Sequence, residues 1–324
     1  MRNAKRHARI VKFRAPKNDG PLTVAEMIDR YLEFARGYYR HKDGTPTSES
    51  PAIKSAMARL RTYYGSLPCN DFGPRKLRKL VDKMKDEKLA RGTINGYVKR
   101  LKMAFKWATS EELIDPSVFH GLFAVGGLRR FRGGRETAPV RPVSQTAIDA
   151  AVERLSPVVA AMVRLHVLLG CRPGELCLMR PCDIDRTGEV WEYRPERHKT
   201  QYAGHTRVIA IGPQAQEILR PFLERAVGAY CFCPREAWQA GGYNPPGDCY
   251  LVSSYRVAVG RACKRAGITP WTPNQLRHTT ATRIRRRFGI EAAQAILGHA
   301  DADVTLVYAE KDQKLAADVA RAMG

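Results

Sequence analysis

A break at residues 121–142 divides this chain into two parts. Its sequence is GLFAVGGLRRFRGGRETAPVRP, with five glycines, two prolines and five arginines, and it ends the helical spacing that precedes it. Glycine and proline at this density are typical of a connection between domains. A chain of 324 residues is also long for one hydrophobic core. We therefore expect a first domain over 21–125, a linker over 126–142 and a second domain over 143–324.

The first domain is predicted to be helical. Thr23 and Glu26 have the spacing of a capping box, and apolar residues recur at helical intervals after them. Three further helical stretches are expected, near 52–64, 74–88 and 92–113. Residues 1–20 precede the domain as a basic tail, with seven Lys or Arg and one acid. Such a tail is usually solvated, and it could become ordered on a phosphate backbone.

The helix expected at 92–113 carries two stripes. One is apolar and is typical of a core-facing edge: Ile94, Val98, Leu101, Phe105 and Ala108. The other lies about 100° round the helix axis and is mostly basic: Arg91, Asn95, Lys99, Lys102 and Lys106. A basic stripe is either a solvated face or a DNA-binding surface, and the spacing alone leaves both interpretations open.

The second domain is predicted to combine helices with a small β element. Alternating residues in GEVWEYRP and HTRVIAIGP indicate two strands, joined by the hairpin loop ERHKTQYAG. Helical stretches are expected at 214–227, 253–266, 272–288, 290–297 and 303–322. The predicted fold class is thus mainly α with a small antiparallel β element. Phosphate-binding glycine motifs and a serine-hydrolase elbow are not found, which gives no support for those activities.

The charge of the chain points to a polyanionic partner. Lys and Arg number 55 against 32 Asp and Glu, a formal net charge of +23. Nucleic acid is the commonest partner of such a chain, and a membrane surface is the alternative. No segment is long and apolar enough for a membrane span, and the N-terminus lacks the apolar core of a signal peptide. We therefore expect a cytoplasmic protein that binds nucleic acid.

The eight cysteines do not form a recognisable metal pattern. Cys231, Cys233 and Cys249 are the one grouping that could hold a metal ion. Reduced thiols that pack as small apolar groups are the favoured interpretation, and no metal or other cofactor is predicted.

Two arginines stand at predicted helix starts. Pro173 suits the first position of a helix and keeps Arg172 out of helical geometry. Thr272 begins a second helix, which places Asn274, Arg277 and His278 on one side of its first turns. Arginine at a helix N-terminus suits a phosphate group, although pairing with a carboxylate such as Glu175 would also explain it.

The order of these residues resembles the tyrosine recombinase (phage integrase) family. Its most specific segments are GCRPGEL, NQLRHTTAT and LGHADADVTLVY. The resemblance covers residues 143–310, and the first domain resembles the helical core-binding domain of that family. It implies a mixed α/β catalytic domain that clamps DNA together with the first domain. It also implies a homo-oligomer on DNA, a tetramer during synapsis, with a C-terminal helix that docks on the neighbouring protomer.

The resemblance implies roles for individual residues. Tyr308 would attack a DNA phosphodiester and form a 3′-phosphotyrosyl link, which suits a phenol because it is a good leaving group in the reverse step. Arg172 and Arg277 would hold the phosphate, and Lys199 would protonate the leaving 5′-oxygen. His299 would bind the phosphate or manage the Tyr308 proton. Glu175 and His278 would support the site, and metal ions would not be needed.

Asn274 departs from the family pattern, which usually has histidine at this position. Asparagine donates hydrogen bonds but cannot transfer a proton at neutral pH. We therefore expect Asn274 to position the phosphate, while proton transfer depends on Lys199 and His299.

Other interpretations remain. Tyr308 lies one helical turn after Val304, so residues 297–310 alone would also fit an ordinary packing contact. A DNA-binding accessory protein or repressor could use the same scaffold without catalysis. An enzyme that relaxes supercoiled DNA, of the type IB topoisomerase kind, would use the same phosphotyrosyl chemistry. The complete set of five predicted catalytic residues favours a recombinase that integrates or excises a mobile element.

Overall fold

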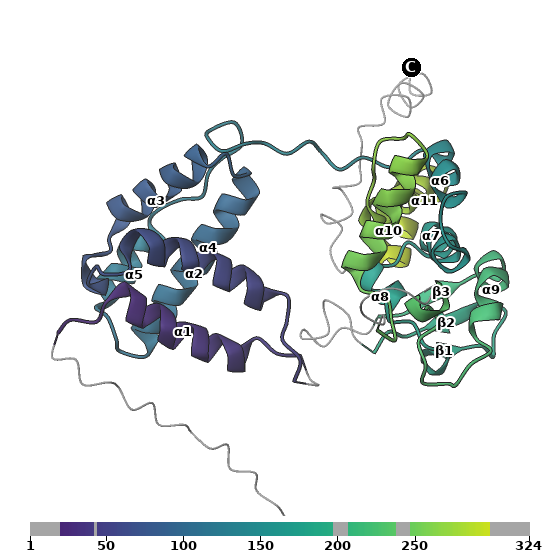
Figure 1. Cartoon of the computed structure of the whole chain (residues 1–324), viewed down its shortest axis with the longest axis horizontal. Helices are drawn as coiled ribbons and strands as arrows, with labels where there is room; N and C mark the ends of the chain where they lie inside the picture. Colours follow the sequence, from purple (N-terminus) through teal and green to yellow (C-terminus); the bar gives the residue numbers. More distant parts are fainter. Residues whose placement is uncertain (1–19, 42–43, 197–206, 238–246, 299–324) are drawn as a thin grey trace, which may run out of the picture. The chain divides into compact units, whose positions relative to one another are not determined.

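The structure, a computed structural model, describes residues 20–41, 44–196, 207–237 and 247–298. The chain divides into two compact units, Met1–Ala138 and Pro139–Gly324 (Figure 1). Both units are mainly helical, and unit 2 adds a small antiparallel sheet. The predicted fold class is therefore confirmed. The division after Ala138 falls inside the segment that the sequence indicates as a linker.

Unit 1 is built around one long helix. Its elements are α1 (Val24–Tyr38), α2 (Glu49–Tyr64), the 3-10 turn η1 (Cys69–Asp71), α3 (Pro74–Asp86), α4 (Arg91–Ser110) and α5 (Pro116–Phe123). Helix α4 packs against the other four helices, and its predicted apolar stripe is buried. The capping box of α1 is also confirmed, because the Glu26 carboxylate accepts the backbone N–H of Thr23 at 2.9 Å.

The break at 121–142 begins inside a helix that the sequence did not indicate. Helix α5 runs through Gly121, and it starts where the Asp115 carboxylate accepts the backbone N–H of Ser117 at 2.7 Å. An N-cap of this kind stabilises a short helix against the cost of one glycine.

The next part of the break is attached to the start of α4. The side chain of Asn95 binds both the backbone N–H and the carbonyl of Leu128, at 2.8 and 3.0 Å. The backbone N–H of Arg91 donates to the carbonyl of Arg135, and its side chain donates to Glu136. Residues 128–136 therefore belong to the packed part of unit 1.

Unit 2 surrounds a buried helix. Its α-helices are α6 (Gln145–Val152), α7 (Pro157–Leu169), α8 (Pro173–Cys177), α9 (Pro213–Leu219), α10 (Val252–Arg265) and α11 (Pro273–Leu297), and its 3-10 turns are η2 (Pro181–Asp183), η4 (Arg220–Phe222) and η5 (Pro234–Ala237). Helix α7 is apolar on nearly all sides and contacts α6, α9, α10 and α11. A helix with this composition is stable only in a protein interior, which makes α7 the centre of the unit.

The sheet consists of β1 (Ile184–Asp185), β2 (Trp191–Tyr193) and β3 (Ile209–Ile211), in that order and antiparallel (Figure 1). Tyr193 pairs with Ile209 across the predicted hairpin, so the two predicted strands are confirmed. The sequence did not indicate β1, because two residues are too short to show an alternating pattern.

One predicted helix was too long. Residues 214–227 were expected to be helical, but α9 ends at Leu219 and continues only as the 3-10 turn η4. Pro221 explains this end, because proline has no N–H to donate and its ring clashes with the preceding turn. Helix α11 spans the two stretches expected at 272–288 and 290–297, which meet at a kink at Gly289, with φ 87°.

None of the helices in the described ranges is long and apolar enough to cross a membrane.

Candidate active site

Arg172 lies at the start of α8, as its sequence predicts. It has extended backbone angles, φ −77° and ψ 147°, and Pro173 is the first helical residue. The Glu175 carboxylate accepts the backbone N–H of Arg172 at 2.7 Å and its Nη1 at 2.8 Å. Glu175 is buried, whereas a quarter of the Arg172 side chain is exposed. The guanidinium of Arg172 is therefore held in place yet accessible to a ligand.

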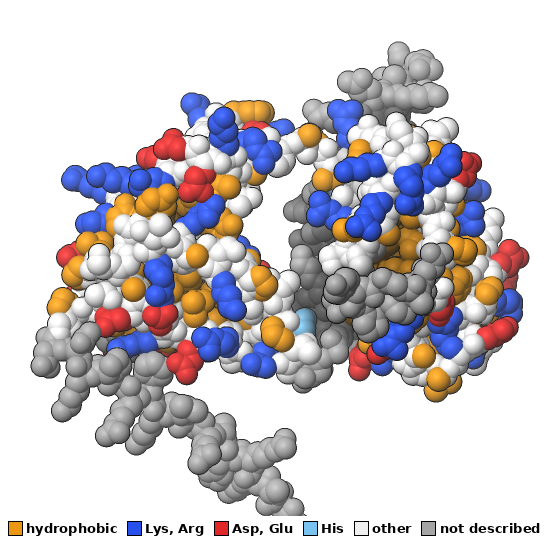
Figure 2. Space-filling model, in the orientation of Figure 1, with side chains coloured by type: hydrophobic (Ala, Val, Ile, Leu, Met, Phe, Trp, Pro, Cys, Tyr) orange, Lys and Arg blue, Asp and Glu red, His pale blue; other side chains and the backbone are white. Residues whose placement is uncertain are grey.

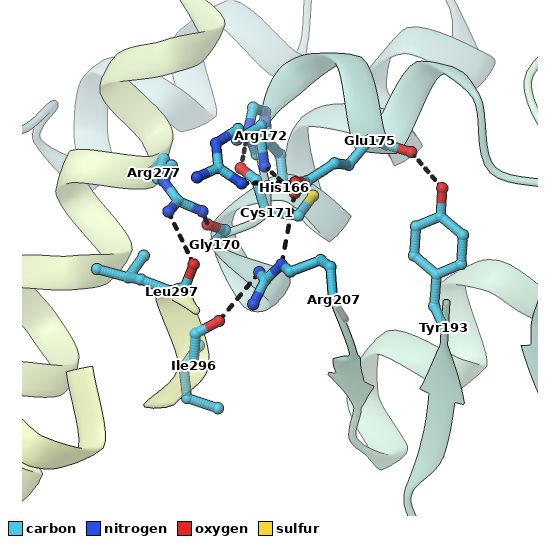
Figure 3. A network of polar contacts seen from close by, with 10 residues as sticks. All are labelled: His166, Gly170, Cys171, Arg172, Glu175, Tyr193, Arg207, Arg277, Ile296 and Leu297. Atoms are coloured by element: carbon cyan, nitrogen blue, oxygen red, sulfur yellow. Dashed lines mark hydrogen bonds and ion pairs between the residues drawn. The ribbon is translucent and has the colours of Figure 1, made fainter. Parts of the chain in front are cut away.

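Arg277 lies in the second turn of α11 and is buried. Helix α11 starts as predicted, because the backbone N–H of Thr272 donates to the Gln275 side chain at 2.9 Å. Arg277 donates through Nη1 to the carbonyl of Gly170 and through Nη2 to that of Leu297, both at 2.8 Å (Figure 3). These carbonyls lie at the C-terminal ends of α7 and α11, where positive charge is favoured. Arg277 thus joins two helix ends.

Both helix ends close with a glycine in the left-handed region. Gly170 has φ 59° and Gly298 has φ 62°. At Gly170 a Cβ atom would lie 2.9 Å from Cγ2 of Thr280, and at Gly298 it would overlap Nη1 of Arg207. Glycine is required at both positions by backbone angle and by space.

Arg207 is a third arginine beside Arg172 and Arg277, and the sequence did not indicate it. Its side chain is 5% exposed, Nη2 donates to the carbonyl of Ile296 at 3.2 Å, and Nε lies 3.9 Å from Glu175. Arg207 lies two residues before β3 and alternates with the buried Ile209 and Ile211 of that strand. A charge at an alternating position on an apolar strand face was the signal that could have identified it.

His166 lies beneath the arginines and is uncharged. Burial lowers its pKa to about 4, and the positive charge of Arg277 acts in the same direction. Its Nε2 lies 3.0 Å from the carbonyl of Cys171, so Nε2 carries the proton and Nδ1 accepts from the Tyr255 hydroxyl at 3.4 Å. His166 therefore fixes the end of α7 without adding charge.

The cluster has an excess of positive charge. The guanidinium groups of Arg172 and Arg207 lie against the carboxylate of Glu175, and that of Arg277, bound to the carbonyl of Gly170, lies close enough for its charge to act on Arg207 (Figure 3). Burial lowers the pKa of Arg207, and the neighbouring positive charges of Arg277 and Arg172 contribute, while Glu175 opposes the shift. Buried charges of one sign need a counter-charge to offset their desolvation. An anion with several oxygen atoms, such as a phosphate, fits this requirement.

The remaining predicted site residues fall into two groups. Asn274 is exposed on the first turn of α11, and His278 is half-buried one turn later, where burial and the charge of Arg277 lower its pKa. Lys199, His299 and Tyr308 lie outside the described residues, as do the basic tail at 1–19 and the predicted C-terminal helix.

The basic stripe of α4 contains residues that are bonded within unit 1 and residues that are exposed to solvent. The side chains of Arg91, Asn95 and Lys102 donate hydrogen bonds within unit 1. Lys102 donates to the carbonyls of Phe123 and Val125. Lys99 and Lys106 are exposed. DNA contact by this stripe stays a prediction, and Lys99 and Lys106 are the members whose side chains face solvent.

The cysteines pack as individual thiols. Cys231 is buried, whereas Cys233 and Cys249 are partly exposed. Within the described ranges, no group of three His, Cys, Asp or Glu side chains is arranged to hold a metal ion.

Comparison with known sequences gives matches of two kinds. The sequence profile described as "Phage integrase family" matches residues 144–314. Two curated proteins named integrase/recombinase, from Escherichia coli and Pseudomonas aeruginosa, are each 42% identical over 57 residues. Those alignments cover 17% of this chain and 17% of each relative, so they compare only a small part of either protein.

Solved structures resemble about nine tenths of the chain in fold. The Tn1549 transposon integrase in complex with circular intermediate DNA has a TM-score of 0.66 at 19% identity, over 92% of this chain and 99% of that one. A lambda integrase dimer bound to a COC′ core site also has a TM-score of 0.66 at 19% identity, over 90% and 78%. A lambda integrase tetramer bound to a Holliday junction has the same TM-score at 16% identity, over 89% and 78%. At these identities the likeness concerns the fold.

Proposed function

Because the chain belongs to the phage integrase family of tyrosine recombinases, we propose that it is a site-specific DNA recombinase. It would cut and rejoin DNA through a 3′-phosphotyrosyl intermediate, for the integration or excision of a mobile element. The observation that carries this proposal is the cluster of three arginines, Arg172, Arg207 and Arg277, in which Arg172 and Arg207 share the carboxylate of Glu175. Such a cluster favours a phosphodiester whose negative charge increases in the transition state.

The proposed reaction is a transesterification. The phenolic oxygen of Tyr308 attacks the phosphorus, the bond to the 5′-oxygen breaks, and Lys199 gives that oxygen a proton. Arg172 and Arg277 hold the non-bridging oxygens, and Asn274 donates a hydrogen bond to the phosphate. His299 binds the phosphate or accepts the proton that the Tyr308 hydroxyl loses. The reverse attack by a 5′-hydroxyl on the tyrosyl ester rejoins a strand, so the number of ester bonds is conserved.

The surface charge supports double-stranded DNA as the partner. From Cys249 to Ile290 the sequence contains nine Lys or Arg and no Asp or Glu. Four of these side chains are exposed on α10, namely Arg256, Arg261, Lys264 and Arg265, and Figure 2 shows basic side chains gathered on this part of unit 2. Phosphate contacts of this kind dominate the affinity of proteins for DNA. We also propose a homo-oligomer on DNA, a tetramer in synapsis.

The function can be tested by covalent trapping. The full chain is incubated with a pool of nicked duplexes of random sequence in EDTA, then denatured in detergent. We expect DNA linked to the protein through its 3′ phosphate and a short released strand with a free 5′-hydroxyl, because a nick lets that strand diffuse away. Sequencing of the linked ends identifies the target site. Tight binding of the pool without a covalent protein–DNA link would instead support the accessory-protein alternative. Relaxation of a supercoiled plasmid without strand exchange would support the topoisomerase-like alternative.

The roles of Lys199 and Asn274 can be separated with a sulfur-containing substrate. In DNA with a 5′-bridging sulfur, the leaving thiolate needs no proton. We therefore expect Lys199→Ala to cleave this substrate at nearly the wild-type rate, although it cleaves normal DNA poorly. Asn274→Ala should stay impaired on both substrates, at a cost of about 1–3 kcal/mol. Single-turnover cleavage rates measure both effects, and rescue of Asn274→Ala alone would reverse the two assignments.

A further inference from the structure

Residues 129–132 form a turn with unusual backbone geometry. The backbone N–H of Arg132 donates to the carbonyl of Arg129 at 3.1 Å, which closes the turn, and Phe131 at its third position has φ 61°. Turns that need a positive φ at this position normally use glycine. A bulky side chain in the left-handed region is strained, and such strain is kept where the surrounding structure imposes it.

The surroundings of this turn do impose its geometry. Oε1 of Glu136 accepts the backbone N–H of Phe131 at 3.2 Å and Nε of Arg91 at 2.7 Å. On the other side, Asn95 binds both backbone groups of Leu128. Two polar residues from the first turns of α4 therefore anchor the two ends of the turn, and its strained conformation is a fixed feature of unit 1.

The turn displays one aromatic ring among positive charges. Phe131 is 77% exposed, and the guanidinium carbon of Arg130 lies 4.9 Å from the centre of its ring. Arg129, Arg130 and Arg132 are all exposed, and none of the three forms a salt bridge among the residues that the structure describes. An exposed ring in a strained position adds nothing to the core, which indicates a binding role.

We propose that this turn inserts Phe131 into the minor groove of DNA, with Arg129, Arg130 and Arg132 bound to the groove and the adjacent phosphates. The minor groove is about 6 Å wide, too narrow for a helix but wide enough for the tip of a turn. Proteins that bind there combine arginines with an apolar wedge that partly separates two base pairs. The proposal rests on the proposed function, because that function makes double-stranded DNA the partner.

The variant Phe131→Gly should weaken DNA binding without lowering the thermal stability of the chain. Glycine accepts the positive φ without strain, and little packing is lost because the ring is exposed. We expect the unfolding temperature of the full chain to be no lower than that of the wild type. Its affinity for a mixed-sequence duplex, measured by fluorescence anisotropy, should fall about tenfold, as expected for the loss of one stacked ring. The loss should be the same at every salt concentration, because the ring carries no charge.

Two matched variants complete the test. Glu112→Gly relieves another positive φ, 56°, which lies at the far end of α4, and it should leave DNA affinity undiminished. Arg130→Gln should weaken binding and reduce the salt slope by about one. A minor-groove-binding polyamide should compete with the wild type more strongly than with Phe131→Gly.

Three results would overturn the proposal. These are wild-type affinity for Phe131→Gly, a loss of affinity accompanied by a lower unfolding temperature, and equal competition by the polyamide against both proteins. These measurements concern equilibrium binding to intact DNA. A failure of the proposed strand cleavage would therefore leave them unchanged, and the two proposals can fail separately.

Discussion

Tyr308→Phe should bind the same DNA as the wild-type chain and form no covalent complex with it. Phenylalanine keeps the ring but removes the oxygen that would accept the phosphoryl group. We expect the rate of covalent trapping on nicked DNA to fall by about ten-thousandfold or more, because no other group replaces a lost nucleophile. The affinity for intact duplex, measured in parallel, should change by about twofold at most, within the range of about 0.5 kcal/mol that many single substitutions stay within.

The structure supplies matched controls for this substitution. Tyr255 and Tyr193 also lie in unit 2, but both are buried. Burial raises the pKa of each phenol, which disfavours the phenolate that attack would require. The Tyr193 hydroxyl also donates to the carbonyl of Glu175 at 2.6 Å. Tyr255→Phe should therefore retain trapping. A denaturant-resistant DNA adduct of the Tyr308→Phe protein would refute the assignment of the nucleophile.

Arg172→Ala should reduce cleavage by about 100-fold or more, since one fixed charge on the phosphate contributes roughly 3 kcal/mol in the transition state. Its side chain is partly exposed, and the buried Glu175 keeps the backbone N–H of residue 172 and the nearby Arg207, so the free energy of unfolding should fall by only about 1 kcal/mol. Arg277→Ala should lower cleavage by as much and also lower the free energy of unfolding, by about 3 kcal/mol. The additional loss arises because the carbonyls of Gly170 and Leu297 lose their shared donor.

Arg180→Ala is the control for these arginine variants. Arg180 also pairs with a carboxylate three residues later in unit 2, through two contacts of 2.9 Å with Asp183. Its removal should leave the single-turnover rate of DNA cleavage near that of the wild type. If Arg172→Ala weakened binding and cleavage equally, Arg172 would serve general DNA affinity and not the transition state.

The starts of the helices that carry the site could be predicted because they depend on local chemistry. Pro173 after Arg172, and Thr272 with Gln275, fix the beginnings of α8 and α11 through backbone angle and hydrogen bonds within four residues. The buried stripe of α4 followed from residue spacing for the same reason. Such patterns are visible in sequence because both partners lie within one or two helical turns.

Contacts between distant segments could not be predicted in this way. Asn95 was grouped with a basic stripe by its spacing, yet its partner is Leu128. Arg207 joins the site through Ile296 and Glu175, which lie in other elements. Periodicity shows which face of an element a residue occupies, but it does not show which segment packs on that face.

The contact between Arg207 and Gly298 has a consequence for how this sequence can vary. A side chain at 298 would displace the guanidinium, and loss of the guanidinium would remove a donor to the carbonyl of Ile296. A change at either position therefore disturbs the other, even though they belong to different parts of the chain. We therefore expect substitutions at 207 and 298 to have non-additive effects on the free energy of unfolding, as residues in direct contact do.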